Sequence, residues 1–315
     1  MKIDNPSIDL VYLWVDGNDP KWLEKREPYL EKKRTNSLKN FRSYFNNDEL
    51  KYSLRSVERY APWVRKIFIL TDNQKPKWLD ISNPRIKIVN QNDILPRKSL
   101  PCFNSNLIEQ FLHKIPNLSE HFILSNDDMF LNKTVLPTIF FAADGFPIIR
   151  LNRKPFRKFR WFLREKIFKK PHKMYSKALF NAAELVKDKF GLFYNGLPHH
   201  NMDSYLKSDC MRVSEKIFKN EIDNMKINHV RSENDIQRVI YSYVALAEKR
   251  GYLQYVSGNE SFHVHIQKDR HYDKLKKFNP TFFCMNDTEY ADDKDRMKLK
   301  VWLNSRFPEK SEFEK

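Results

Sequence analysis

The stretch IDLVYLWVDGNDP at residues 8–20 joins a short apolar run to a cluster of turn residues. An apolar run of this length that stops at Asp16 and Gly17 indicates a buried strand followed by a turn. The stretch HFILSNDD at residues 121–128 has the same form and ends in two carboxylates. Strands that are apolar on both faces are typical of parallel sheets covered by helices, so the two stretches indicate a sheet of that kind.

Strand and helix patterns alternate between these two stretches. Further strands are expected at residues 66–72 and 85–90, and helices at residues 48–59 and 104–115. This alternation predicts an α/β fold with a mainly parallel central sheet, in which ligands bind beyond the carboxyl ends of the strands. The WVDG and SNDD segments follow two such ends.

The composition limits the classes of protein to which the chain belongs. Its 315 residues are 41% hydrophobic and 31% charged, which excludes a disordered or collagenous chain. The net charge of +17 indicates an anionic partner such as a phosphorylated substrate, an anionic lipid surface or a nucleic acid. The 3 Cys lack CxxC spacing, so we expect neither a disulfide framework nor a structural zinc site, and a reducing cytoplasm fits best. Residues 1–10 lack the apolar stretch of a signal peptide and no apolar run reaches membrane-spanning length, so we expect neither a signal peptide nor a membrane-spanning segment.

The alternation stops after residue 150, where a basic and aromatic segment begins. Residues 153–177 carry eleven Lys and Arg against the single Glu165. Aromatic residues between cations are typical of a helix that lies on an anionic bilayer, although a core helix with a solvated basic face is the plainer alternative. Single-stranded nucleic acid ranks last because no nucleic-acid-binding motif accompanies the segment. Helices are expected again near residues 177–190 and 233–249.

Asp127 and Asp128 are the first candidates for chemistry. Adjacent carboxylates at a strand end suit a hard cation such as Mg²⁺, which completes its shell with water and phosphate oxygens. The commoner explanation of a lone acid pair is a turn. The surrounding sequence has to decide between them.

Histidines supply a second set of candidates. His199 and His200, in the loop-like GLPHHNMD, could act as a general base or contact a phosphoryl oxygen, whereas a surface pair is the commoner case. His263 and His265, in SFHVHIQ, share one face of an expected strand. This spacing would allow both imidazoles to bind one metal ion, but we favour ordinary packing of the two side chains.

The HVRSENDIQ segment contains a candidate phosphate ligand. Arg231 precedes an expected helix start, where it could bind a phosphate or remain a solvated arginine. Ser232 and Asp235 have the spacing of a helix cap, and a role in capping alone would explain Asp235. Spacing does not choose between these alternatives.

Several blocks together resemble the Stealth family of sugar-1-phosphate transferases. They are IDLVYLWVDGNDPKW, FRSYFNNDELKYSLRSVERYAPWVRKIFILTDNQKPKWL, HFILSNDDMF and HVRSENDIQ, which recur in order. The family includes bacterial capsular polysaccharide phosphotransferases and the catalytic subunit of the animal lysosomal-enzyme GlcNAc-1-phosphotransferase. The resemblance covers most of residues 8–132 and, more loosely, 177–290.

The resemblance implies a Rossmann-like, GT-A-related fold and a defined reaction. A UDP-hexose or UDP-N-acetylhexosamine gives its sugar-1-phosphate to a hydroxyl of a glycan or lipid-linked oligosaccharide, forming a phosphodiester and releasing UMP. Such chemistry needs cationic stabilisation of two phosphates, with Mg²⁺ or Mn²⁺ as the implied metal. One catalytic domain over residues 1–315 is expected: a nucleotide-sugar and metal half at 1–150, a basic insertion at 151–177, and a half with the catalytic His and Arg at 178–315.

The resemblance also implies roles for individual residues. It makes Asp127 and Asp128 the metal ligands, His200 the catalytic histidine with His199 as the alternative, and Arg231 a catalytic phosphate ligand, with Asp128 also catalytic. Donor-binding residues are Trp14, Asp16, Gly17, Asn47, Asp48, Arg55 and Asn126, with Glu49 on the same helix. Phosphate-binding or supporting residues are Asp235, Gln237, Asn286 and Asp287.

The sequence therefore predicts a bacterial enzyme of capsule or cell-surface polysaccharide synthesis. We expect it in the cytoplasm, with residues 153–177 as the part that would contact the inner face of the plasma membrane. The alternatives are a conventional glycosyltransferase that releases UDP and a non-catalytic module that binds anionic lipid or nucleic acid. The latter predicts steeply salt-dependent association without metal-dependent nucleotide release.

Overall fold

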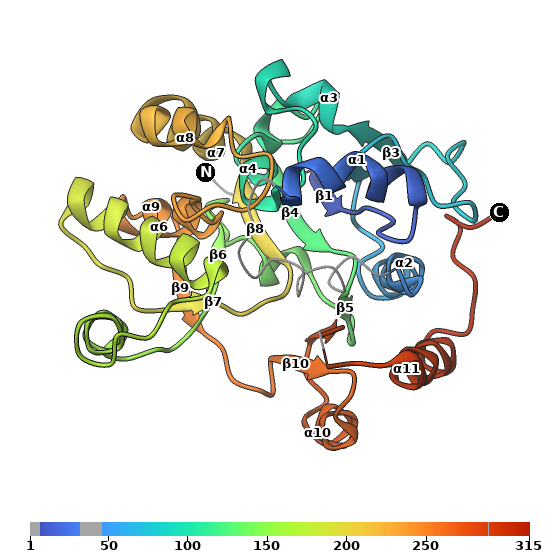
Figure 1. The fold of residues 1–315 in the computed structure, drawn as a ribbon. Helices are drawn as coiled ribbons and strands as arrows, with labels where there is room; N and C mark the ends of the chain where they lie inside the picture. Colours follow the sequence, from blue (N-terminus) through green and yellow to red (C-terminus); the bar gives the residue numbers. More distant parts are fainter. Residues whose placement is uncertain (1–6, 32–45, 289) are drawn as a thin grey trace.

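A five-stranded sheet forms the centre of the molecule (Figure 1). In the computed structural model, which describes residues 7–31, 46–288 and 290–315, its strands lie in the order β3-β2-β1-β4-β8. Their bounds are Ile8–Leu13 for β1, Ile67–Thr71 for β2, Ile86–Asn90 for β3, His121–Asn126 for β4 and Asp203–Leu206 for β8. The first four are parallel to one another and β8 runs antiparallel to β4. The expected α/β fold with a mainly parallel sheet is confirmed.

Two smaller sheets extend this centre. One has the order β10-β11-β5 and the other the order β7-β6-β9. The first contains β5 (Met129–Leu131), β10 (Ser261–His265) and β11 (Phe282–Asn286). The second contains β6 (Ile148–Asn152), β7 (Leu197–Pro198) and β9 (Tyr252–Tyr255). Because β5 follows β4 after two residues, the first small sheet lies next to the end of the central one.

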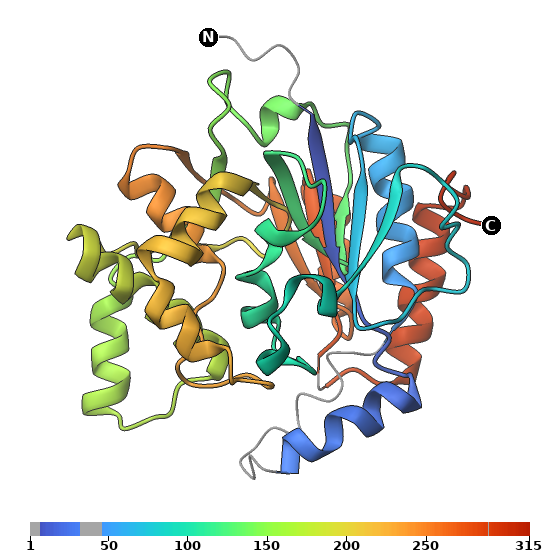
Figure 2. The ribbon, with the colours of Figure 1, turned by 90° about the horizontal axis from the view of Figure 1, so that it is seen from above.

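Helices cover both faces of the central sheet. Figure 2 shows α2 on one face, and α4 with α7, α8 and α9 toward the other. α11 lies beside α2 and packs on the small sheet of β5, β10 and β11. The α-helices are α1 (Pro20–Glu31), α2 (Glu49–Tyr60), α3 (Gln91–Ile94), α4 (Ser105–Glu109), α5 (Arg157–Phe162), α6 (Met174–Phe190), α7 (Lys207–Arg212), α8 (Lys219–Met225), α9 (Val239–Ala247), α10 (Asp269–Phe278) and α11 (Asp293–Arg306). This two-sided cover explains why the strands have apolar residues on both faces.

β1 shows how the sequence determines the packing. Its residues Leu10 and Tyr12 pack in one apolar cluster with Leu54 of α2. Val11 lies in a second cluster with Leu107 of α4, since successive side chains of a strand point to opposite faces. Burying each such large apolar side chain contributes about 1.5–3 kcal/mol. A single polar substitution in β1 would therefore disturb one face and leave the other in place.

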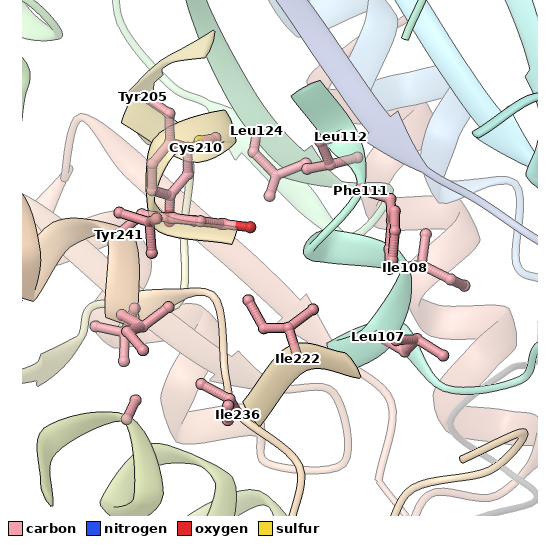
Figure 3. Packing of buried hydrophobic residues seen from close by; sticks show 14 of the residues in the cluster. Leu107, Ile108, Phe111, Leu112, Leu124, Tyr205, Cys210, Ile222, Ile236 and Tyr241 are labelled. Carbon is pink, nitrogen blue, oxygen red and sulfur yellow. The ribbon is translucent and has the colours of Figure 1, made fainter. Parts of the chain in front are cut away.

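The second cluster joins the central sheet to the helices of the second half of the chain (Figure 3). Phe111 and Leu112 approach it from the segment after α4, and Ile222 comes from α8. Tyr241 of α9 donates or accepts a hydrogen bond with Ser214 at 2.7 Å, so its hydroxyl is satisfied inside the core. This cluster fixes α9, and with it the residues before α9, against the sheet.

Two expected helices are shorter than the sequence pattern indicates. The helix at 104–115 ends at Glu109, where the Gln110 side chain turns to donate to the carbonyl of Ile236 at 3.0 Å. The helix at 233–249 begins only at Val239. Tertiary hydrogen bonds between these two segments have replaced helical ones at both places.

The basic segment is helical, as expected, but its helix is short. α5 continues into one π-helical turn, and the indole of Trp161 stacks on His172 with 3.4 Å between ring centroids. Phe156, Phe159 and Phe162 are more than half exposed. Among the described residues, no helix combines the length and the apolar character that crossing a bilayer requires.

Candidate active site

A cavity of about 630 Å³ lies at the carboxyl ends of β1 and β4. The two strands end side by side because Leu13 of β1 pairs with Asn126 of β4 in the parallel register. β11 reaches the same place because the N–H of Met285 donates to the carbonyl of Asp128 at 2.9 Å. Three segments that are distant in the sequence therefore meet at one cavity.

Nine of the fifteen predicted site residues line this cavity. They are Trp14, Asn126, Asp127, Asp128, His200, Arg231, Gln237, Asn286 and Asp287. The six that do not line it are Asp16, Gly17, Asn47, Asp48, Arg55 and Asp235. Residues 41–45, which open the second resembling block, lie outside the described residues.

Three carboxylates form the acidic wall of the cavity: Asp127, Asp128 and Glu49. Burial raises the pKa of Asp127, and the adjacent charge of Asp128 raises it further. Burial also raises the pKa of Asp128, with the charge of Glu49 adding to the effect. In the described part of the chain, no Lys, Arg or His nitrogen lies within 4.0 Å of these carboxylates. Among the described residues, the acidic wall therefore has no cationic side chain paired with it.

Glu49 joins this wall from the first turn of α2. Its carboxylate accepts hydrogen bonds from the backbone N–H of Asn47 at 2.6 Å and from the Asn47 amide at 2.7 Å. Burial and the charge of Asp127 nevertheless raise its pKa. Asn47 thus supports Glu49 and does not itself line the cavity, so its expected contact with the donor stays a prediction.

A divalent cation fits the acidic wall. Oδ1 of Asp128 is buried and has no hydrogen-bond partner among the described residues, while Oδ2 accepts from the Cys284 thiol at 3.2 Å. A buried carboxylate oxygen without a partner is costly, and a cation would satisfy it. Mg²⁺ needs only one or two carboxylates because water and phosphate oxygens complete its shell.

The two adjacent histidines differ in what surrounds their rings. His199 is 3% exposed, its Nδ1 lies 3.0 Å from the Ser261 hydroxyl, and its Nε2 lies 3.3 Å from a carboxylate oxygen of Asp203. The His200 ring has no hydrogen bond to any described residue, and it lies 6.4 Å from the Tyr175 ring. Both histidines line the cavity, and Nε2 of His199 makes no hydrogen bond despite its closeness to Asp203. His200 differs in that its ring has neither a hydroxyl nor a carboxylate partner among the described residues.

His200 is held in the form that accepts protons. Burial lowers its pKa to about 4, and the nearby positive charge of Arg238 adds to this effect. A histidine with such a pKa is neutral at physiological pH. Its backbone φ of 61° is left-handed, a conformation that non-glycine residues adopt at turns and functional sites.

Arg231 enters the cavity from the segment before α9. Its Nη2 donates to the Ser105 hydroxyl at 3.1 Å, which orients the guanidinium toward the start of α4. The expected contact between Ser232 and Asp235 is present, because the Asp235 carboxylate accepts from the Ser232 N–H at 2.8 Å, but the helix begins only at Val239. Asp235 is wholly buried and also accepts from the side-chain amides of Asn104, Asn106 and Asn228. Asp235 therefore fixes the Arg231 segment, in keeping with the supporting role among those expected for it.

Arg238 forms a second charged group that the sequence did not indicate. Its Nη1 donates to Glu109 at 2.6 Å, and its Nη2 lies 3.4 Å from Asp203. Burial would lower the pKa of Arg238, but the two carboxylates outweigh burial and raise it. Asp203 also contacts His199, so this network extends to the histidine loop.

Arg55 does not line the cavity, and its expected role in donor binding stays a prediction. Its guanidinium binds both carboxylate oxygens of Glu314 at 2.7 Å and donates to the carbonyl of Phe307 at 2.7 Å. The pKa of Arg55 is raised by its hydrogen bonds to Glu314. Arg55 thus holds the C-terminal segment against α2.

Three other residues expected to bind the donor lie in the segments just before α1 and α2. Asp16 caps its own turn by accepting from the N–H of Asn18 at 3.0 Å, and its backbone exchanges hydrogen bonds with Gln74. Gly17 is buried in that turn. Asp48 precedes α2 with a left-handed φ of 65°, and its side chain makes no cap hydrogen bond. Their place next to Trp14 and Glu49 explains why they belong to the same sequence blocks.

The C-terminal segment returns to the cavity, as the resemblance implied. Asn286 ends β11 and lines the cavity together with Asp287. Asp287 is held by two hydrogen bonds from Arg296, at 2.8 and 3.2 Å. Gln237 also lines the cavity while its Oε1 accepts from the N–H of Val239, which begins α9.

A different set of residues has the arrangement of transition-metal ligands. Among the described residues, His200, His263 and Cys284 form the one group of three or more His, Cys, Asp or Glu ligand atoms within 4.8 Å of one another. His263 and His265 do lie on one strand, as expected, and their rings are 4.9 Å apart. Neither histidine spacing nor the Cys count indicated that Cys284 would join them.

The fold itself has distant likenesses among solved structures. A galactosyltransferase, LgtC, solved with donor and acceptor sugar analogs, has a TM-score of 0.46 at 12% identity and covers 96% of both chains. Mouse xyloside xylosyltransferase 1 has a TM-score of 0.41 at 10% identity, covering 89% of this chain and 97% of that one. No site residue is transferred from these proteins.

The sequence relatives are closer. The family models for Stealth conserved regions 1 and 2 match residues 6–34 and 43–149. An exopolysaccharide phosphotransferase of Lactiplantibacillus plantarum is 48% identical over 140 residues, which is 44% of this chain and 41% of that protein. Several other relatives are likewise matched over less than half of their length, as is a capsular polysaccharide phosphotransferase of Streptococcus pneumoniae at 43%.

One relative is matched over most of both chains. A capsular polysaccharide phosphotransferase of Haemophilus influenzae is 34% identical over 300 residues, covering 89% of this chain and 78% of that protein. The aligned part therefore includes both the acidic wall and the second half of the chain. With the two conserved-region matches, this likeness shows that the chain belongs to the Stealth family.

Proposed function

We propose that the chain transfers hexose-1-phosphate from a UDP-sugar to a hydroxyl of a glycan acceptor, releasing UMP, in the synthesis of a capsular or cell-surface polysaccharide. The observation that carries the proposal is that the acidic wall of Asp127, Asp128 and Glu49, which has no cationic partner among the described residues, lines the same cavity as a neutral His200. Family membership supports the phosphotransfer reaction, since the relatives quoted above bear that name.

The acidic wall is proposed to hold Mg²⁺ or Mn²⁺ through Asp127 and Asp128. When bound, the cation would neutralise charge on the donor diphosphate and on the departing UMP. Glu49, which accepts hydrogen bonds from Asn47, supplies a third carboxyl group beside these two. Trp14 and Asn126, which end the neighbouring strands, border the same space and are proposed to contact the donor.

His200 is proposed to act as the general base. The acceptor oxygen forms a bond to the β-phosphorus, the bond from that phosphorus to the bridging oxygen breaks, and UMP leaves. The acceptor hydroxyl proton moves to the free ring nitrogen of His200. Arg231, held by Ser105, is proposed to bind a phosphoryl oxygen and offset the charge that develops there.

The basic segment is proposed to bring the acceptor to the cavity. Lys154 and Tyr175, from its two ends, line the cavity. Between them, Phe156, Phe159 and Phe162 are exposed, and Lys and Arg residues stand between them in the sequence. An exposed aromatic and basic surface of this kind fits an anionic membrane or a lipid-linked acceptor.

The nucleotide product tests the proposed reaction. Purified protein is incubated with Mg²⁺, a panel of UDP-hexoses and UDP-N-acetylhexosamines, and a crude glycan acceptor, and the released nucleotide is identified by chromatography. We expect UMP release that requires acceptor and stops with a chelator. Release of UDP would assign the chain to conventional glycosyl transfer, and salt-dependent binding to vesicles or oligonucleotides without nucleotide release would support the non-catalytic alternative.

A further inference from the structure

Three potential metal ligands from separate segments converge beside the acidic wall. The parallel register of β10 and β11 pairs His263 with Cys284. His200 approaches them from the loop after β7, with 4.9 Å between its ring centroid and that of His263. One ligand atom from each of the three residues lies within 4.8 Å of the other two.

The surroundings of these ligands leave coordination unfilled. Nε2 of His263 is buried and has no hydrogen-bond partner among the described residues. A buried polar atom without a partner costs about 1–3 kcal/mol, so a ligand at this point would be favoured. Cys284 is wholly buried, and its thiol donates to Oδ2 of Asp128 at 3.2 Å.

The donor set selects a different cation from the acidic wall. Two imidazoles and a thiolate are ligands of Zn²⁺ and Co²⁺, whereas Mg²⁺ prefers oxygen. A fourth position would be open to water or to the neighbouring carboxylate of Asp128. Binding converts the Cys284 thiol to a thiolate and releases one proton to the solvent for each ion bound.

We propose that His200, His263 and Cys284 form a binding site for Zn²⁺ or a similar thiophilic cation, and that this cation inhibits transfer by occupying the nitrogen of His200. The binding site stands on the geometry, whereas the inhibition rests on the proposed function of His200 as the base. The cavity then has two cation sites of opposite effect, an oxygen site that supports the reaction and a nitrogen–sulfur site that stops it.

Cobalt spectroscopy tests the site without reference to activity. Metal-free protein is titrated with Co²⁺ in the presence of excess Mg²⁺, and thiolate-to-cobalt charge-transfer absorption is recorded. We expect the band in the wild type, its absence in Cys284→Ser, and at least about tenfold weaker cobalt binding in His263→Ala. Cys102→Ser and Cys210→Ser remove the other two buried cysteines and serve as matched controls that keep the band.

The outcomes separate the site from its effect. Absence of the band in the wild type, or its persistence in a Cys284→Ser variant with wild-type thermal unfolding, overturns the site. Cys284→Ala provides a second variant if the serine proves unstable. Inhibition by micromolar Zn²⁺ of UMP release, weaker in His263→Ala, supports the effect, and a wild-type rate unchanged by Zn²⁺ at cobalt-competing concentrations overturns it. If no sugar donor is turned over, the cobalt titration still decides the site.

Discussion

Two groups of buried charges border the cavity, and they differ in balance. Arg238 has two carboxylate partners, Glu109 and Asp203, so its charge is matched within the protein. Asp127 and Asp128 have no such partner among the described residues, and burial raises the pKa of both. The charges of the Arg238 group are satisfied within the protein. The buried carboxylates of Asp127 and Asp128 instead lower the stability of the folded protein until a ligand pairs with them.

The two groups have different roles in the molecule. The Arg238 network connects α4, β8 and α9, which are the elements that position the histidine loop and Arg231. Asp127 and Asp128 of the acidic wall directly follow β4, whose backbone is fixed by the register with β1. Substitutions in the two groups should therefore change different quantities, stability in one and turnover in the other.

The largest effect is expected from Asp128→Asn. Loss of one charge from the acidic wall should lower the rate of UMP release by roughly 10³-fold, because cation and donor phosphates lose their partner. The thermal unfolding temperature should stay the same or rise, since a buried repulsive charge is removed. Steady-state rates and calorimetry measure the two quantities, with the exposed Asp188→Asn as the control. A near-normal rate would contradict the assignment.

Substitutions of the two histidines test the same contrast between turnover and stability. His200→Gln should lower kcat by roughly 10²- to 10⁴-fold with little change in unfolding temperature. His199→Gln should lower the unfolding temperature, because both ring nitrogens of His199 lie against partners inside the protein. Kinetics and thermal unfolding of both variants test this, and the reverse pattern would make His199 the base.

Arg238→Met should act on stability. Removal of one partner leaves Glu109 and Asp203 buried without their cation, which costs about 3–5 kcal/mol of unfolding free energy. Denaturant unfolding measures the loss. A double variant, Arg238→Met with Glu109→Gln, should recover part of it, and no recovery would show that the acids are not the source of the cost.

The stability of the acidic wall should depend on pH. The pKa of Asp127 is raised from 3.8 to about 7, so the folded protein keeps a proton that the unfolded chain has lost. The unfolding free energy therefore falls as pH rises across this range. Relative to the wild type, Asp127→Asn should gain stability between pH 4 and about 7, with Mg²⁺ reducing the difference at the upper end. A constant difference across the titration would contradict the raised pKa.

The smallest effect on turnover is expected at Arg55. Arg55→Ala should weaken the attachment of the C-terminal segment by removing the pair with Glu314, yet leave kcat per folded molecule near the wild-type value. Limited proteolysis of the C-terminus and the rate of UMP release measure the two effects. A fall in kcat with an unchanged C-terminus would support the donor-binding role.

Local pattern was enough to predict the four parallel strands of the central sheet, but not the antiparallel β8. The apolar runs at β1 and β4 end in polar residues, and parallel packing places those ends together. For Asp127 and Asp128 this pattern left a turn as the commoner explanation, and the family resemblance was needed to predict a metal site. The partners of Arg55 and Arg238 could not be found, because Glu314 and Glu109 lie 259 and 129 residues away along the chain. Cys284 meets His263 only through the register of two strands whose pairing no local signal specifies.

The path of the β-phosphorus tests the central claim most directly. UDP-sugar labelled with ³²P in the β-phosphate is incubated with the enzyme, Mg²⁺ and the glycan acceptor, and nucleotide and glycan are separated. We predict that the label moves to the glycan in a phosphodiester, that UMP is unlabelled, and that Asp128→Asn prevents the transfer. Label that stays with the nucleotide while sugar appears on the glycan would contradict the account.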